Sequence, residues 1–127
     1  MEAVKNLTAA ALEARVCRIA EILEELKMED IVALDMRRVT DFADYFIIAT
    51  ASSSAQMHAA GTKVMRQLKS EGVKVFVPAE NDGPNWNVLD YGDVIVHLFE
   101  PSTRTHYNLE SLWGDADILD WKTAQAS

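Results

Sequence analysis

Apolar residues near the start of the chain recur at steps of three and four, the spacing of one face of a helix. The positions are Leu12, Val16, Ile19, Leu23 and Leu26. They predict an amphipathic helix over about residues 8–27, with Thr8 or Asn6 as its cap. A coiled coil has the same period, but the short length of the pattern favours packing on a sheet.

The middle of the chain alternates between strand-like and helix-like patterns. Residues 30–36 and 45–50 are short runs rich in β-forming residues, joined by a polar connection. Ser53 and Gln56 then have the spacing of a capping box, which predicts a helix that Gly72 ends. Its buried face is expected to contain Met57, Gly61, Val64 and Leu68.

Residues 86–99 have the pattern of a β-hairpin. Residues 73–77 before it predict a third strand, followed by a loop over 78–85. The hairpin turn is expected at residues 90–93, where Gly92 can take a positive φ angle without steric cost. Residues 94–99 are nearly all apolar, which is typical of a central strand covered on both faces.

The last part of the chain predicts one more helix and a tail. Pro101 is placed to open a helix that ends at about Trp113. Residues 1–114 are therefore expected to form a single domain, and residues 115–127 a loosely attached acidic tail. Ile118, Leu119 and Trp121 are the residues that could dock it. The predicted order, α-β-β-α-β-β-β-α, gives an α/β or α+β fold with a mixed sheet of about five strands flanked by helices.

Size and composition are those of a globular protein rather than a disordered or membrane one. The 127 residues are 49% apolar and 25% charged. The longest apolar run, residues 45–51, is far shorter than the ~20 residues that cross a bilayer. Because residues 1–7 resemble neither a signal peptide nor a transit peptide, a cytoplasmic location is the expectation.

The net charge narrows the class of partner, and the cysteine content narrows the chemistry that is expected. A net charge of −8, with dispersed basic residues, argues against direct binding of nucleic acid, which requires lysine and arginine to displace counterions. It suits a basic protein instead, with charge acting mainly on the association rate. The single cysteine, Cys17, excludes an intramolecular disulfide, and its place in a predicted helix favours a packing role over that of a nucleophile.

Motifs for catalysis and for metal binding are missing from the sequence. No glycine precedes the helix that Ser53 caps, so a phosphate-binding loop is not expected there. No G-x-S-x-G elbow is found, and the three histidines lack metal-ligand spacing. The D-x-D pair Asp115 and Asp117 lies in the predicted tail, where solvated charges are the better interpretation. No cofactor and no metal are expected.

Two clusters mix large aromatic side chains with carboxylates. One is the hairpin, with Trp86 and Tyr91, and the other is the segment 104–113. Tryptophan and tyrosine give much contact area for few rotatable bonds and are frequent hot spots of protein interfaces. The clusters therefore indicate a protein-binding module before they indicate an enzyme.

The two clusters are the second and third of three ordered blocks with fixed internal spacing. The first is Asp44-Tyr45-Phe46-Ile47-Ile48-Ala49-Thr50 followed by Ser53. The second is Trp86-x-x-Leu89-Asp90-Tyr91-Gly92-Asp93-x-x-Val96-His97, and the third is Arg104-x-x-Tyr107-x-Leu109-Glu110-x-Leu112-Trp113. Over about residues 12–113 the chain resembles the Iojap-like family, the ribosomal silencing factors of bacteria. It departs from the family pattern at Ala51, usually glycine, and at Asn108, usually aspartate.

The resemblance implies a nucleotidyltransferase-like fold without established catalysis. It also implies a translation repressor that binds the large ribosomal subunit through ribosomal protein L-fourteen and blocks association with the small subunit. The contact residues expected are Trp86, Leu89, Asp90, Tyr91, Asp93, His97, Tyr107, Glu110 and Trp113. Of these, Trp86 and Tyr91 would supply apolar contact, and the three carboxylates would pair with basic residues of the partner.

Several alternatives stay open at this level. Trp113 and Leu109 could simply pack the last helix on the sheet. The role of His97 could be limited to orienting Asp90 or Glu110. The protein could instead be a nucleotidyltransferase-like enzyme, degenerate or active, that binds nucleotide and magnesium through Asp35, Asp41 or Asp44. It could also form a homodimer with a regulatory role, which is compatible with the repressor hypothesis.

Overall fold

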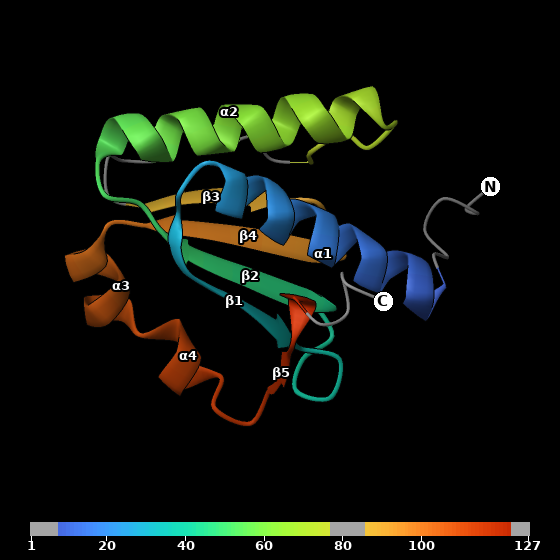
Figure 1. Ribbon diagram of the computed structural model, residues 1–127. Helices are drawn as coiled ribbons and strands as arrows, with labels where there is room; N and C mark the ends of the chain where they lie inside the picture. Colours follow the sequence, from blue (N-terminus) through green and yellow to red (C-terminus); the bar gives the residue numbers. More distant parts are fainter. Residues whose placement is uncertain (1–7, 77–85, 123–127) are drawn as a thin grey trace.

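The computed structural model describes residues 8–76 and 86–122, which form a mixed sheet with helices on both of its faces (Figure 1). The elements in chain order are α1 (Ala9–Glu25), β1 (Glu29–Asp35), β2 (Tyr45–Thr50), α2 (Ser54–Ser70), β3 (Trp86–Asp90), β4 (Val94–Phe99), α3 (Pro101–Tyr107), α4 (Leu109–Leu112) and β5 (Asp117–Leu119). The predicted α+β fold class is confirmed.

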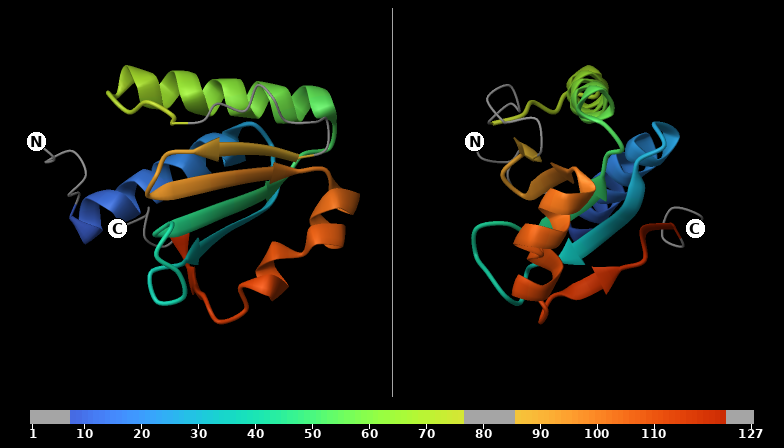
Figure 2. Two further views of the ribbon diagram at one scale, coloured as in Figure 1. Left: turned by 180° about the vertical axis from the view of Figure 1, so that it is seen from behind. Right: turned by 90° about the vertical axis from the view of Figure 1, so that its left-hand side faces the viewer.

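The sheet has the strand order β3-β4-β2-β1-β5. The pair β2 and β4 is parallel, and the other neighbouring strands are antiparallel. Figure 2 shows α1 and α2 on one face of the sheet and α3 and α4 on the other. We call these the first and the second face. None of the helices in the described ranges is long and apolar enough to span a membrane.

The helix α1 follows its predicted pattern. Four of the five positions of the apolar stripe are buried, and Leu26 is partly buried against the same core. Thr8 is the cap, because its Oγ1 accepts a hydrogen bond of 3.0 Å from the backbone N–H of Ala11. The stripe packs on the first face of the sheet, as the periodicity predicts.

The helix α2 begins with a capping arrangement that differs in one bond from the predicted box. Ser53 Oγ accepts from the backbone N–H of Gln56, as expected, at 3.0 Å. Gln56 Oε1 accepts a hydrogen bond from the backbone N–H of Ser52 rather than from that of Ser53. The Nε2 of Gln56 also donates to the carbonyl of Leu26 at 3.0 Å, so this side chain ties α2 to the end of α1. The predicted buried face of α2 is confirmed.

The third predicted strand, over residues 73–77, is wrong for the residues that the structure describes. Residues 73–76 have no strand geometry. The backbone N–H of Phe76 donates to the carbonyl of Asp90 at 2.7 Å, beside the outer edge of β3. One such bond does not build a ladder, and strand propensity without a continuous partner does not make a strand. Val77 and the predicted loop 78–85 lie outside the described residues.

The predicted last helix is two helices. Pro101 opens α3, as expected from its fixed φ angle. Asn108 then takes a left-handed conformation, with φ of 48°, and the chain changes direction before α4. Asparagine is one of the few residues other than glycine that adopt this conformation readily, which explains the break at this residue.

The predicted tail is part of the sheet over its described residues. The strand β5 pairs antiparallel with β1, placing Leu119 opposite Ala33. Trp121 is buried, and its Nε1 donates to the carbonyl of Ile31 at 3.2 Å. Of the three expected docking residues, Leu119 and Trp121 pack on the core as expected, whereas Ile118 is 73% exposed. Loose attachment is therefore wrong for residues 117–121, and the strand count of five holds because β5 replaces the missing third strand.

Candidate functional site

The hairpin β3–β4 divides the predicted contact residues between the two faces of the sheet. Because side chains alternate along a strand, Leu89 lies on the first face, and Tyr91 beyond it joins the same core beneath α1 and α2. Leu89 is fully buried, and burial raises the pKa of Tyr91 to about 12. The structure thus places both in the core, contrary to the prediction that they contact a partner.

The second face carries a continuous band of aromatic rings. The band consists of Phe42, Phe46, Trp86, His97, Phe99, Tyr107 and Trp113. The Trp86 ring stacks on Phe99 with centroids 4.9 Å apart and lies 4.6 Å from the ring of Tyr107. The His97 ring meets Phe46 at 4.8 Å, edge to face. We call this set the aromatic band.

Four members of the aromatic band are accessible to a partner. Phe42 is 56% exposed and Tyr107 is 49% exposed, while Trp86 and Trp113 are partly buried. The Phe42 ring lies 5.9 Å from the ring of Trp113. Sequence reasoning missed Phe42, although an aromatic residue inside the polar connection between two strands was a usable signal. The expectation that Trp113 packs the last helix on the sheet holds in part, since its ring also contacts Phe46.

His97 is a buried member of the aromatic band. Its side chain is 7% exposed, and Nδ1 accepts a hydrogen bond of 3.3 Å from Nε1 of Trp86. Its Nε2 is buried and has no hydrogen-bond partner among the described residues. Burial lowers the pKa of His97 to about 4, so the imidazole is neutral near pH 7. The prediction that His97 orients Asp90 or Glu110 is wrong, because the group it holds is the indole of Trp86.

The carboxylates of the hairpin turn lie at one end of the sheet. Asp90 Oδ1 accepts from the backbone N–H of Gly92 at 2.8 Å and so shapes the turn, where Gly92 has a φ of 86°. The carbonyl of Asp93 accepts from the N–H of Asp44 at 2.7 Å, which brings the turn next to the connection that carries Phe42. Burial, and then the charge of Asp93, raise the pKa of Asp44. Carboxylates therefore border the end of the aromatic band.

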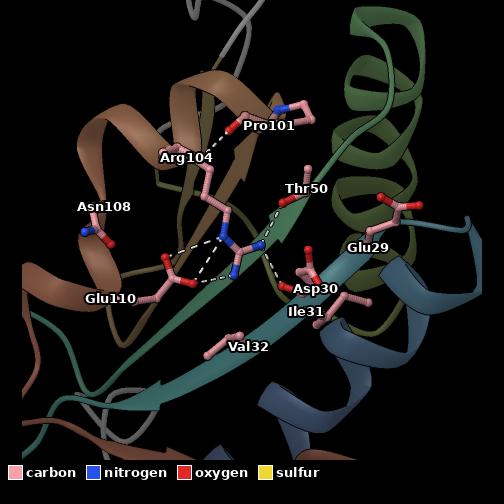
Figure 3. Close-up of a pocket in the computed structure, with 10 residues that line it drawn as sticks. Glu29, Asp30, Ile31, Val32, Thr50, Pro101, Arg104, Asn108 and Glu110 are labelled. Carbon is pink, nitrogen blue, oxygen red and sulfur yellow. Dashed lines mark hydrogen bonds and ion pairs between the residues drawn. The ribbon is translucent and has the colours of Figure 1, made fainter.

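Glu110, a further expected contact, is bonded within the chain. Its Oε2 lies 2.6 Å from Nη2 of Arg104. Figure 3 shows the Arg104 side chain reaching from α3 towards β1 and β2, where Nη1 donates to the carbonyl of Asp30 and to Oγ1 of Thr50, each at 2.7 Å. The hollow around this guanidinium has a volume of about 710 Å³. The centre of the hollow is thus filled by Arg104, which connects α3, α4 and the sheet. Its charge is largely neutralised by Glu110.

Of the carboxylates proposed for the enzyme alternative, Asp35 and Asp44 lie close enough for the charge of Asp35 to help raise the pKa of Asp44. Both oxygens of Asp35 accept from the guanidinium of Arg37, at 2.9 Å and 2.6 Å, and this pairing lowers the pKa of Asp35. Across residues 8–76 and 86–122, no three histidine, cysteine, aspartate or glutamate side chains lie where they could share a metal ion. Burial raises the pKa of Cys17, which favours the unreactive thiol.

Comparison with known proteins gives consistent matches over most of the chain. The family model described as "Ribosomal silencing factor during starvation" matches residues 9–127. The ribosomal silencing factor of Bacillus subtilis is 39% identical over 101 residues, which are 80% of this chain and 86% of that protein. The chloroplastic protein Iojap of Zea mays is 38% identical over 80% of this chain, which corresponds to 44% of that longer protein.

The fold has a close counterpart among solved structures. A crystal structure of a protein from Chromobacterium violaceum superposes with a TM-score of 0.74 and 34% sequence identity, over 80% of this chain and 85% of the other. The resemblance that the three sequence blocks indicate is therefore confirmed over the whole described fold. This chain belongs to the family of ribosomal silencing factors, which also includes the Iojap proteins.

Proposed function

We propose that this protein regulates translation by binding the large ribosomal subunit, and that it does so through ribosomal protein L-fourteen. On that subunit it would occupy the face on which the small subunit docks, so that the two subunits cannot join. Membership of the ribosomal silencing factors supports association with ribosomes. The partner and the steric mechanism follow from the family resemblance and are the part to be tested.

The observation that carries the proposal is the accessible part of the aromatic band. Trp86, Tyr107, Trp113 and Phe42 present aromatic surface from three different segments on the second face of the sheet. They form two pairs, Trp86 with Tyr107 and Phe42 with Trp113, which buried rings of the band connect. We call these four residues the patch; exposed aromatic residues of this kind are a usual source of binding energy. The patch revises the expected contact set: Phe42 joins it, and Leu89, Tyr91 and His97 leave it.

Charge favours a basic protein as the partner. The chain has a net charge of −8, and Asp90, Asp93 and Asp44 lie at one end of the patch. Ribosomal RNA would be repelled by such a surface, whereas lysine and arginine side chains of a ribosomal protein would be attracted. We expect these carboxylates to speed association at low salt more than they strengthen the final complex.

Steric exclusion requires no catalysis, and we propose that the protein is not an enzyme. Asp35 is neutralised by Arg37, and the helix α2 begins on a serine cap instead of a glycine loop. Calorimetry with ATP, CTP and magnesium tests this part. Saturable binding below millimolar nucleotide would favour the nucleotidyltransferase alternative.

The direct test is sedimentation of purified large and small ribosomal subunits through sucrose gradients, with and without the protein. We expect the protein to travel with the large subunit and the fraction of joined ribosomes to fall. The double variant Trp86→Ala, Trp113→Ala should do neither while its circular dichroism stays near that of the wild type. Joining that is unaffected by saturating wild-type protein would contradict the proposal.

A homodimer can form without contradicting this function. If two copies associate through the same patch, self-association and ribosome binding compete. Light scattering with and without large subunits distinguishes this arrangement, because competition would convert dimers into subunit-bound monomers.

A further inference from the structure

We propose that His97 is a positioning residue for ribosome binding: through its Nδ1 it fixes the orientation of the Trp86 indole in the aromatic band. This inference rests on the proposed function and names a residue that controls the same surface without touching the partner. It starts from the hydrogen bond of 3.3 Å between Nε1 of Trp86 and Nδ1 of His97.

The hydrogen bond determines the tautomer of His97. The indole N–H can only donate, so Nδ1 must accept and the proton of the neutral ring lies on Nε2. That Nε2 is buried and has no partner among the described residues. A buried donor without an acceptor is costly, and a leucine or phenylalanine at this position would avoid the cost. Packing alone therefore does not explain a histidine here, whereas the acceptor offered to Trp86 does.

The bond to His97 adds to the packing that holds the ring of Trp86. Its ring is held between Phe99, with centroids 4.9 Å apart, and Tyr107, at 4.6 Å. These contacts define the plane of the indole. The χ2 torsion of an aromatic ring is broad and roughly two-fold, so a half-turn preserves the plane but exchanges the two edges of the indole. The half-turn removes the N–H from Nδ1 and carries the six-membered ring to the other side, so the bond to His97 and the packing together select one orientation.

A single indole orientation matters for binding because Trp86 is only partly exposed. The edge that remains accessible is then always the same one, and the partner need not select it. Pre-organising a side chain in its bound conformation strengthens binding by lowering the entropy lost on association. Removing the acceptor should therefore weaken binding without removing any contact to the partner.

Two substitutions at position 97 separate the acceptor from the packing. In His97→Asn, the side-chain oxygen occupies the place of Nδ1 and can still accept from Trp86. In His97→Leu, a methyl group occupies it. We expect His97→Leu to weaken binding to the large subunit about fivefold relative to His97→Asn, which is the effect of one neutral hydrogen bond. The melting temperature of both variants is measured first, so that affinities are compared on folded protein.

A second pair of variants tests whether the effect passes through Trp86. Trp86→Phe keeps an aromatic ring and lacks the N–H, so in this background His97→Asn and His97→Leu should bind equally. A difference that persists without the N–H would overturn the inference. If His97→Leu does not fold, His97→Val replaces it, because a β-branched apolar side chain suits a strand and offers Trp86 no acceptor.

Hydrogen exchange at the indole N–H gives a readout that does not need the ribosome. We expect the Trp86 indole N–H to be protected in the wild type and in His97→Asn, and to exchange faster in His97→Leu. Equal protection in all three proteins would overturn the inference even if the ribosome assay succeeded. Absence of ribosome binding by the wild type, with unequal protection of the indole, would overturn the proposed function and leave the orientation by His97 established.

Discussion

Arg104 and Glu110 form an ion pair in which Nη2 and Oε2 are 2.6 Å apart. The carboxylate expected to meet a basic residue of a partner thus meets one in its own chain. Arg104 is 12% exposed at its side chain and also bonds to Asp30 and Thr50. This arginine consequently joins both short helices to the two strands beside them, and the second face depends on it for its shape.

We expect Arg104→Met to lower the free energy of unfolding by about 2 kcal/mol, because it leaves Glu110 and the carbonyl of Asp30 without their donor. Glu110→Gln should cost about 1 kcal/mol. Glu71→Gln is the control: it weakens the more exposed pair with Arg18 and should change stability by less than about 0.5 kcal/mol. Chemical denaturation measures all three. If Glu110→Gln reduced ribosome binding at unchanged stability, its carboxylate would belong to the interface.

The two tyrosines of the sequence blocks should behave in opposite ways. Tyr91 is buried and its hydroxyl has no partner among the described residues, so Tyr91→Phe should leave ribosome binding unchanged and raise stability slightly. Tyr107 is exposed and touches Trp86, so Tyr107→Ala should weaken binding by about 1 kcal/mol or more at nearly unchanged stability. Affinity for the large subunit, measured beside thermal melting, separates them. The reverse pattern would return Tyr91 to the interface.

Local sequence signals predicted those elements whose partners lie nearby or whose periodicity is strong. The stripe of α1, the cap at Ser53 and the glycine turn of the hairpin are of this kind. Residues 73–76 and β5 show the limit. The first has strand composition but too little partner backbone, and the second has the composition of an acidic tail but meets the free edge of β1.

The candidate site was predicted in its chemistry but only partly in its members. The hairpin was identified correctly, yet which of its residues are exposed depends on which face α1 and α2 cover. Alternation along the strand separates Leu89 from Trp86, but it does not say which of the two faces the helices cover. Only the tertiary structure assigns Leu89 to the core and Trp86 to the surface. Phe42 was missed because its neighbours in the band, Phe46 and Trp113, are assembled only by the fold.

His97 should make stability depend on pH in the acid range. The pKa of His97 is lowered to about 4 in the folded protein, whereas an unfolded histidine titrates near 6.5. Between these values the unfolded chain binds more protons. The stabilising contribution of neutral His97 is therefore fully present above pH 6.5. As the pH drops to 4, the free energy of unfolding falls by roughly 3 kcal/mol on account of this residue.

Aspartates such as Asp35 and Asp44 also titrate in acid, so the histidine is isolated by difference. Urea denaturation of the wild type and of His97→Asn is compared from pH 7 to pH 4. We expect the wild type to lose more stability over this interval than the variant. Parallel curves would mean that His97 is accessible to protons in the folded state.

The C-terminal segment is predicted to contribute directly to stability. Trp121 is buried in the same core as α1, and its Nε1 donates to the carbonyl of Ile31. Trp121→Ala should lower the free energy of unfolding by about 3 kcal/mol, the usual cost of removing a buried tryptophan. Ile118→Ala, three residues earlier on β5, removes a side chain that is 73% exposed and should cost little. Equal small effects would show that the segment is loosely attached after all.

Phe42 provides the sharpest test of the aromatic band, because the chain contains a matched control. Phe42 and Phe76 are both phenylalanines with mostly exposed side chains, but only Phe42 contacts other rings of the band. Phe42→Ala should weaken binding to the large subunit by about 1 kcal/mol or more, whereas Phe76→Ala should have no effect. The difference between the two effects on binding would then arise from the position of the ring and not from its hydrophobicity. If Phe76→Ala weakened binding and Phe42→Ala did not, the contact surface would lie at the outer edge of β3 instead of on the second face.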